Sequence, residues 1–522
     1  MAFNSVQFAA LLAATLGLYW WSPPPARRWV LLVSSYAFYA YADWRFCGLL
    51  ALTTALTYAA GRLLAAVEDE GTRAVIRTTA IVANLLVLVE FKYLDFFFDA
   101  FSEMAEQLGF SSPDWTLRLV LPVGLSFYIF QAISYVMDVH RREYDAVRSP
   151  LVFAVYMAYF PKMLAGPIER ARHLVPQIER PADGLRAGQA LEGAELIVIG
   201  LFKKVAVADV MLRVVVDVYA PIELNVHNGW TTLLLSLPAF GVQIYCDFSG
   251  YSDIARGVSK LFGIELTKNF LRPKNSRTVL EFWQRWHVTF TRFIRDYLLR
   301  PLGGFHGSDA ILMRNAVIVF GLTGLWHGAR WPLIIWGLSL GVCVGIALIL
   351  SERRRSSRRA GAARPSTGTG TVGPAGTGAG PAAAVIARPT RSGLNLRDVR
   401  RRAQVLLLLM LSTPLFVAPT LEQAWRVYKG IFTLTPGPIE WNHVITVAYG
   451  VAMVVLIDRH QQTFEADEDR RGRGRRMGRE DEATDVSLLS SWNWQWRTAA
   501  MVLAIVVFGA NIQAAEFYYF QF

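Results

Sequence analysis

The sequence predicts an all-α polytopic membrane protein with about eleven transmembrane helices plus re-entrant or amphipathic helices. First, hydrophobic types make up 53% of the 522 residues and charged types only 18%, which excludes a disordered chain and disfavours an ordinary soluble enzyme. Second, the apolar residues gather in long runs, while most charged residues lie in the loops between them. Third, Trp (16), Tyr (19) and Phe (31) are plentiful, as in chains that meet two membrane interfaces.

Thirteen apolar runs are candidates for spanning helices, each of which needs about 20 mostly apolar residues. They lie at 5–21, 29–45, 47–66, 75–98, 118–137, 150–165, 193–219, 230–249, 312–326, 331–350, 404–420, 441–457 and 498–514. Several are short or contain polar residues, so we expect about eleven to span the membrane and the others to be re-entrant or buried. The first run has no basic region before it and no A-x-A cleavage signal, which favours a retained helix over a signal peptide.

The positions of Lys and Arg predict which helix ends face the cytoplasm. Arg27 and Arg28 follow the first run, which places the N-terminus outside. Basic residues also gather at 62–77, at 140–148 and at 351–402, where twelve Arg stand against two acidic residues. We expect all three of these segments to be cytoplasmic.

Composition divides the chain into three parts. Residues 1–350 form the predicted membrane-embedded core. Residues 351–403 are rich in Arg, Gly, Ala and Pro and predict a flexible cytoplasmic loop, because such a stretch cannot bury enough surface to order itself. It is either a tether or docking segment, or a tolerated insertion, since long loops cost little entropy. Residues 404–522 hold the C-terminal transmembrane helices, with a polar, poorly ordered loop at about 458–492.

Charge and cysteine content exclude several other classes of protein. The net charge is +12, but the basic residues sit between apolar runs, which indicates the lipid bilayer as a partner and not nucleic acid. Cys47, Cys246 and Cys343 are too few and too scattered for a disulfide framework. We assign no metal site, because His287 and His327 lie forty residues apart with no carboxylate at ligand spacing.

His327 is the first candidate for chemistry. It lies in LTGLWHGARW with an apolar run on either side, where a titratable side chain is costly unless a cavity or partners receive it. Gly324 and Gly328 flank it and allow close approach of another helix or of a substrate. The alternative is a neutral imidazole that is packed in the core and hydrogen-bonded to a carbonyl.

His287 is the second candidate and lies in EFWQRWHVTFTRFIRDYL. On a helix it shares one apolar face with Trp283, Phe290 and Ile294. We therefore predict an amphipathic helix with one histidine on its apolar face. Alone, this pattern fits a packed interface helix, and it is the pairing with His327 that favours a role in chemistry.

Other polar side chains lie near these histidines in the sequence. Asp247 and Asp253 frame DFSGYSD within an apolar stretch, and NFLRP predicts a turn. Candidates for binding a cofactor or donor, none of them assigned beyond that, are Asn269, Arg272, Lys274 and Arg285. Lys274, Arg277, Arg285 and Arg292 would hold the phosphates of an anionic donor. The alternative is that these cations anchor the cytoplasmic face of the membrane.

These segments resemble blocks of the membrane-bound O-acyltransferase (MBOAT) family, most closely of its bacterial branch that acetylates alginate and other exopolysaccharides. In order and at similar spacing over almost the whole chain, the blocks are LPVGLSFYIFQAISYVMDVHR, FPKMLAGPIER, YCDFSGYSDIARG, NFLRP, FWQRWHVTFTRFIRDYLLRPLGG and GLWHGARWPLIIWG. The opening MAFNSVQF and the ending EFYYFQF are also similar. The insertion at 351–402 departs from the compact pattern of the family.

The resemblance implies an MBOAT-like fold and an O-acetyltransferase. The family's intramembrane histidine corresponds to His327, and its second histidine to His287. The substrate would be an acyl thioester such as acetyl-CoA, with no tightly bound cofactor. A neutral His327 can take the proton of a hydroxyl as base, while His287 would orient the acceptor or the donor carbonyl, or hold His327. No G-x-S-x-G segment is present, so a serine acyl-enzyme is not suggested.

The resemblance also implies where the protein works. We expect a multi-pass protein of the bacterial inner (plasma) membrane, working with polysaccharide synthesis and export machinery and with an extracytoplasmic SGNH-hydrolase-like partner. A passage that reaches His327 from both faces would let the acyl group cross. Rival interpretations are a D-alanyl or lipid O-acyltransferase of the same family and, in another class, a transporter or scaffold whose histidines relay protons or pack.

Overall fold

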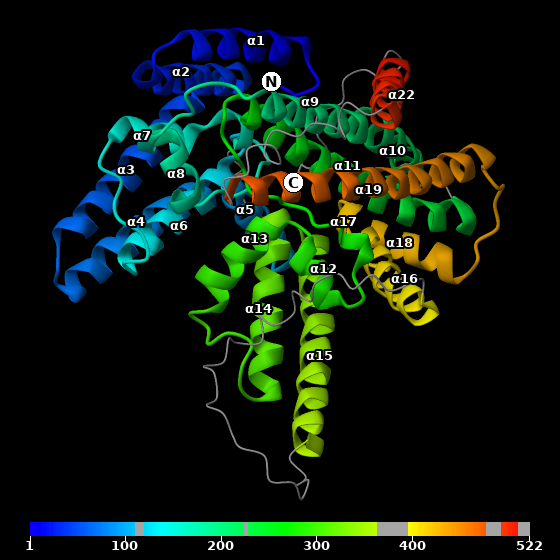
Figure 1. The fold of residues 1–522 in the computed structure, drawn as a ribbon. Coiled ribbons are helices and arrows are strands. Elements are labelled where there is room, and N and C mark those ends of the chain that lie inside the picture. Colours follow the sequence, from blue (N-terminus) through cyan, green and yellow to red (C-terminus); the bar gives the residue numbers. More distant parts are fainter. Residues whose placement is uncertain (110–119, 224–227, 363–394, 477–491, 510–522) are drawn as a thin grey trace, which may run out of the picture. The chain divides into compact units, whose positions relative to one another are not determined.

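The computed structural model describes residues 1–109, 120–223, 228–362, 395–476 and 492–509, and every regular element in these ranges is a helix (Figure 1). The predicted all-α class is therefore confirmed. The chain forms two compact units. Unit 1 comprises Met1–Asn269, Gly328–Arg330 and Val417–Phe522, and unit 2 comprises Phe270–His327 and Trp331–Phe416.

Unit 1 contains most of the helices. They are α1 (Val6–Trp21), α2 (Pro24–Asp43), α3 (Phe46–Ala66), α4 (Glu70–Lys92), α5 (Leu94–Gln107), α6 (Leu125–His140), α7 (Pro150–Ala158), η1 (Phe160–Lys162), α8 (Ala171–Glu179), α9 (Ala187–Leu201), η2 (Phe202–Ala208), α10 (Asp209–Glu223), α11 (Trp230–Leu261), α18 (Leu421–Phe432), α19 (Trp441–Arg476) and α22 (Trp492–Gly509).

Unit 2 contains the remaining helices, most of them short. They are η3 (Pro273–Asn275), α12 (Val279–Arg285), α13 (Val288–Phe293), η4 (Ile294–Leu299), α14 (Asp309–His327), α15 (Trp331–Ala362), α16 (Leu396–Leu411) and α17 (Thr413–Val417), whose last residue belongs to unit 1.

Five of the described helices are long and apolar enough to span a membrane. They are α3, α4, α14, the Trp331–Ser357 part of α15 and the Trp441–Glu465 part of α19. Helix α1 and the Trp494–Gly509 part of α22 are apolar but shorter. Membrane-spanning helices therefore lie where the sequence predicts them, while the total of about eleven stays a prediction.

Three predicted spans are interrupted in the structure. The run at 75–98 consists of two helices, α4 and α5. The run at 150–165 leaves the α-helical path after α7, and Pro161 lies in the short 3-10 helix η1, because proline has no N–H with which to continue an α-helix. The run at 404–420 is broken at Ser412, between α16 and α17.

The two predicted polar loops are shorter than the composition suggests. Helices α15 and α16 extend into the predicted loop 351–403 from its two ends, and α19 extends into the predicted loop at 458–492. Arg and Ala are favourable helix residues, so a spanning helix can continue into a basic segment. The rest of these two loops, residues 363–394 and 477–491, lies outside the described residues.

Within unit 1, helices α9 and α11 touch through glycines. A Cβ atom on Gly200 would lie 2.6 Å from the carbonyl oxygen of Gly250, and one on Gly193 would lie 2.8 Å from that of Gly257. The same holds in reverse, since a Cβ on Gly250 would lie 2.8 Å from the Gly200 oxygen. The two backbones therefore meet at two places where no larger residue fits without a shift.

Buried ion pairs lie beside these glycine contacts. Lys204 is fully buried, and its ammonium lies 2.9 Å from the carboxylates of both Asp247 and Asp209. Lys203 lies 2.6 Å from Asp253. Both lysines belong to η2, a π-helical stretch, and such stretches are frequent at functional sites. Because a buried charge is strongly destabilising without a partner, these pairs fix η2 against α11.

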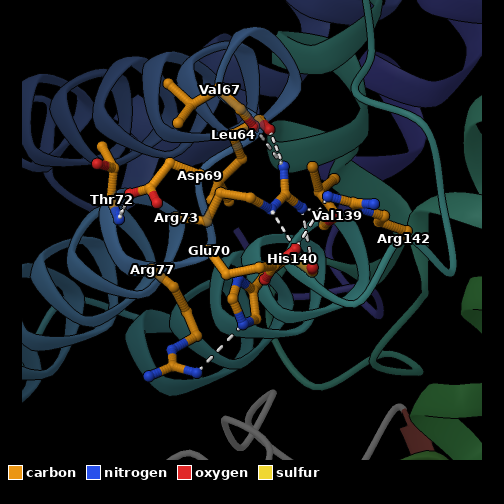
Figure 2. A network of polar contacts seen from close by, with 10 residues as sticks. All are labelled: Leu64, Val67, Asp69, Glu70, Thr72, Arg73, Arg77, Val139, His140 and Arg142. Carbon is orange, nitrogen blue, oxygen red and sulfur yellow. Dashed lines mark hydrogen bonds and ion pairs between the residues drawn. The ribbon is translucent and has the colours of Figure 1, made fainter.

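A second polar network in unit 1 joins α3, α4 and α6 (Figure 2). Arg73 of α4 is 4% exposed and donates to the carbonyl oxygens of Leu64 and Val67 at the end of α3. It also donates to Val139 and His140 at the end of α6, over 3.2 and 2.9 Å. One guanidinium thus satisfies carbonyls that two helix ends leave without an intrahelical partner.

The same network holds a histidine beside a cation. The Nε2 atom of His140 lies 3.2 Å from Arg77 Nη1 (Figure 2), and burial, followed by the charges of Arg77 and Arg73, lowers the pKa of His140. The neutral imidazole is therefore favoured in the folded chain, and the network loses stability as the pH falls below the ordinary value of 6.5. The segments 62–77 and 140–148, predicted to face the same side, come together here.

Unit 2 is built on the antiparallel pair α14 and α15. Gly324 of α14 faces Gly337 of α15, where a Cβ on Gly324 would lie 3.0 Å from the Gly337 Cα. Further from the connection between α14 and α15, a Cβ on Gly345 would lie 2.6 Å from the Met313 sulfur. This close approach holds the last turn of α14, which ends at His327, against the first turns of α15.

We predict that Gly200→Ala destabilises the protein, because its methyl group would push α9 away from α11 and strain the ion pairs beside the contact. Overpacking of this kind costs about 1–3 kcal/mol. The measurement is the thermal midpoint of unfolding in detergent. Unfolding is monitored as the loss of the monodisperse peak in size-exclusion chromatography after heating. Gly48→Ala is the matched control, since a Cβ there meets nothing within 4 Å. Equal midpoints for the two variants would contradict the prediction.

Candidate active site

His327 lies at the C-terminal end of α14, in the part of unit 2 where α14 and α15 are closest. Its ring is 5.4 Å from the ring of Trp336 and 5.1 Å from that of Phe416, nearly edge-on to both. Trp336 and Phe416 also contact each other, at 4.9 Å. The side chain is only partly buried. His327 therefore has aromatic rings on one side and is not sealed in the core.

His287 lies at a break in the chain and not within a helix. Helix α12 ends at Arg285, and His287 adopts a left-handed conformation, with φ 44°, immediately before α13. The predicted continuous amphipathic helix is therefore wrong. A non-glycine residue in this conformation is costly and is kept only where the surroundings hold it. The ring is 3% exposed and stacks 5.1 Å from Phe290.

Trp326 connects the two histidines. Its ring lies 4.7 Å from that of His327 and 6.2 Å from that of His287, and it stacks on Phe290 at 4.3 Å. Both histidines are therefore members of one aromatic cluster within unit 2, although they are forty residues apart in the sequence. No periodicity in the sequence joins α12 to the end of α14, so only the fold brings these rings together.

The surroundings favour a neutral His287. It lies outside the candidate spanning helices, and burial, with a smaller contribution from the charge of His327, lowers the pKa of His287 well below its ordinary value. A neutral imidazole has one nitrogen that accepts and one that donates. Among the described residues, no group of three or more His, Cys, Asp or Glu is placed to hold a metal ion. The cluster is thus suited to proton transfer and hydrogen bonding.

Two of the four predicted donor-binding candidates lie in one loop of unit 2, and a third, Arg285, is the last residue of α12 and contacts this loop. Arg272 adopts a left-handed conformation, with φ 51°, and leads into η3, which contains Lys274. Arg285 closes this loop, because its guanidinium donates to the carbonyl oxygen of Leu271 over 3.1 Å. Its charge is paired with Glu281 at 2.8 Å. The fourth candidate, Asn269, is 1% exposed and is the last residue of the first segment of unit 1.

Sequence reasoning missed the buried charges of unit 1. The lysines of η2 lie within the predicted span 193–219, and their only signal is a Lys-Lys pair inside an apolar run. A fourth buried pair joins Lys260 to Glu192 at 2.7 Å. His460 was also missed: its Nε2 lies 2.8 Å from Glu195, and its ring stacks on Trp494 at 4.1 Å. The partners lie far apart in the chain, so no local pattern reveals them.

Comparison with known proteins gives a consistent set of relatives. Residues 146–359 match the membrane-bound O-acyltransferase family. The chain is 34% identical to a probable alginate O-acetylase of Azotobacter vinelandii over 436 residues, which are 83% of this chain and 78% of that protein. It is 31% identical over 355 residues to a peptidoglycan O-acetyltransferase of Helicobacter pylori, covering 63% of this chain and 66% of that one. A teichoic acid D-alanyltransferase of Bacillus subtilis is 29% identical over 233 residues, covering 42% and 57%.

We predict that diethyl pyrocarbonate modifies His327 faster than His287 in the folded protein, because His327 is only partly buried whereas His287 is 3% exposed. The measurement is peptide mass spectrometry after brief treatment in detergent. His306, which is exposed, serves as the reactive reference, and His460, which is 6% exposed, as the protected one. If His287 were modified as fast as His306, the described burial of the cluster would be wrong.

Proposed function

Because the chain belongs to the membrane-bound O-acyltransferase family and is therefore a multi-pass membrane acyltransferase, we propose that it moves an acetyl group from a cytoplasmic thioester toward hydroxyls of an exported polysaccharide. The alginate O-acetylase of Azotobacter vinelandii, with 34% identity over 83% of this chain, supports acetyl as the cargo and a polysaccharide as the acceptor. Acetyl-CoA is the simplest donor of this class.

The observation that carries this proposal is the unequal exposure of two histidines in one aromatic cluster. A catalytic base must reach the substrate, and His327 is only partly buried. A positioning group must be held still, and His287 is 3% exposed between Phe290 and Trp326. The geometry therefore supports His327 as the base and His287 as the group that orients its neighbours.

In the proposed reaction, the hydroxyl oxygen of the acceptor attacks the carbonyl carbon of the thioester while His327 takes the hydroxyl proton. A new C–O bond forms, the C–S bond breaks, and the proton passes from His327 to the leaving thiolate. The rings of Trp336 and Phe416 cover one side of His327 and keep water away from that side of the reacting groups. Atoms and charge balance without a metal or redox partner.

His287 would act by hydrogen bonding and not as a second base. Its buried ring favours the neutral form, and a neutral imidazole can donate one hydrogen bond toward the donor carbonyl, the acceptor or His327. Removing one donor to a developing oxyanion typically costs about 10²–10³ in kcat. The left-handed backbone at His287 fixes the direction from which this hydrogen bond would come.

The loop of Arg272 and Lys274, together with Arg285 at the end of α12, would bind the phosphates of the donor. Lys and Arg side chains are the usual partners of phosphate, and this loop belongs to the same unit as the two histidines. The sequence predicts that the neighbouring basic segments face the cytoplasm, which is where acetyl-CoA is found. The loop would thus hold the nucleotide end of the donor while the thioester end reaches His327.

The acceptor is expected on the other side of the membrane. We propose that the protein resides in the bacterial inner membrane and that the thioester and the attacking hydroxyl reach His327 from opposite faces, so that the acetyl group crosses the membrane as it is transferred. An extracytoplasmic SGNH-hydrolase-like partner would receive the acetyl group on a hydroxyl of its own and then make the final transfer to a hydroxyl of the polysaccharide, together with the machinery that makes and exports this polymer. This division of tasks explains why an acyltransferase for an exported polymer would be built from spanning helices.

Other acceptors within the family are the second candidate. The peptidoglycan O-acetyltransferase of Helicobacter pylori covers 63% of this chain, whereas the teichoic acid D-alanyltransferase of Bacillus subtilis covers only 42%. The longer and more similar matches favour acetyl over D-alanyl as the cargo. Membership of an acyltransferase family also disfavours the transporter or scaffold considered from the sequence.

We predict that His327→Ala lowers acetylation of the extracellular polysaccharide at least about 100-fold, the lower range of the contribution of a positioned base. His287→Ala should lower it less and should reduce kcat more than it raises KM. The measurement is mass spectrometry of polymer from a deletion strain that carries each variant. His306→Ala, an exposed histidine of the same unit, is the control and should acetylate normally. Normal acetylation by a folded His327→Ala protein would remove this residue from the mechanism.

We predict that Lys274→Gln raises the KM for acetyl-CoA severalfold with little change in kcat, because binding of phosphate is lost equally in the ground and transition states. With acetyl-pantetheine, which lacks the nucleotide, the variant and the parent should have the same KM. Arg353→Gln, an exposed arginine of unit 2, is the control. An equal rise of KM for both donors would show that Lys274 does not bind phosphate.

A further inference from the structure

Helix α16 is attached to the rest of unit 2 by one face. Asp398 lies 3.0 Å from Arg277, and Arg402 donates to Asn275 over 3.5 Å. Val405, on the same side of the helix, is 6% exposed. These residues, spaced four and three apart along the helix, define an inward face that packs on the loop around η3.

The opposite face of α16 combines apolar and basic side chains. Leu396, Val399 and Leu407 are 83%, 44% and 57% exposed. Arg397 and Arg400 lie on this side of the helix, and Arg401, three residues after Asp398, lies at its border with the inward face. All three are exposed as well, and none of them makes an ion pair with a described residue. We call these six residues the outer face of α16.

The arginines of the outer face lie where the helix itself disfavours them. They occupy the first two turns of α16, and a helix N-terminus carries a partial positive charge that repels cations and attracts anions. Asp398, the acidic residue of the first turn, is already paired with Arg277. Repulsion at this end of the helix is relieved if an external anion binds beside the arginines.

The apolar residues decide which anion fits. A soluble phosphate compound would leave Leu396, Val399 and Leu407 in water, whereas the surface of a membrane takes apolar side chains below its phosphates and arginines beside them. The helix continues into LLLLML at its C-terminal end, which suits hydrocarbon, and the sequence places its basic start on the cytoplasmic side. We propose that the outer face of α16 binds the head groups of anionic phospholipids in the cytoplasmic leaflet.

This binding would have a consequence for the loop on the other face of the helix. The inward face of α16 contacts the loop segment that contains Asn275 and Arg277, next to Lys274. An anionic lipid that neutralises the arginines would remove their mutual repulsion and so keep the first turns of α16 helical against that loop. The lipid surface would thereby stabilise the loop through α16, without itself entering the aromatic cluster.

The test measures lipid retention directly and requires no enzymatic assay. The full-length protein, purified in mild detergent, is incubated with phosphatidylglycerol or phosphatidylcholine, and retained lipids are counted by native mass spectrometry at low and high salt. The test variant is R397Q/R400Q/R401Q. Each arginine near an anionic surface contributes about 1 kcal/mol, or about fivefold in affinity. We therefore expect the variant to bind phosphatidylglycerol at least about tenfold more weakly, with its salt dependence reduced.

The matched control is R353Q/R354Q/R355Q, which removes the same formal charge from the cytoplasmic end of α15. It should retain phosphatidylglycerol like the parent, and binding of phosphatidylcholine should be equal in all three proteins. Equal losses in the two triple variants would overturn the proposal in favour of a general effect of net charge. Normal retention of phosphatidylglycerol by R397Q/R400Q/R401Q would overturn the proposal as well. So would a variant that keeps its lipid but binds acetyl-CoA more weakly. Leu396→Ser with Val399→Ser should weaken retention without changing the charge.

Discussion

The burial of charge inside an apolar chain is the constraint on which the structure of unit 1 depends. Lys204 reaches Asp247 and Lys203 reaches Asp253, both on α11, because α9, which leads into η2, meets α11 through glycines. Wider spacing would leave these ions without partners in surroundings that cannot solvate them. The glycines and the ion pairs are therefore one feature: the close contact makes the pairs possible, and the pairs make a looser contact costly.

A feature of this structure could be predicted from the sequence when residues close together in the chain determine it, and not when distant residues do. The helical class and the positions of the spanning helices follow from the length of apolar runs, which is a local property. The break at His287 does not follow, because a histidine in a left-handed conformation is held by Phe290 and Trp326, and Trp326 comes from a distant helix. The ion pairs of the lysines of η2 could not be predicted for the same reason, because a Lys-Lys pair in the sequence does not show that carboxylates of α11 lie beside it.

The two histidines show where resemblance adds to physical reasoning. From its position in the sequence alone, each histidine could be either a catalytic residue or a packed residue of the core, because an imidazole in an apolar segment is compatible with both roles. The order of the blocks in the sequence singled out His287 and His327, and the fold then placed both in one aromatic cluster. What could not be predicted is their difference in exposure, which depends on how α12, α13 and α14 pack around Trp326 and which supports different roles for the two rings.

Polar side chains inside the two units have different kinds of neighbours, and these neighbours suit different tasks. In unit 1 the buried lysines are paired with carboxylates at 2.6–2.9 Å, an arrangement that holds helices together. Around His327 the rings of Trp326, Trp336 and Phe416 form an aromatic cluster. A general base has to gain and lose a proton within one reaction cycle, and an imidazole is the side chain whose ordinary pKa suits that task.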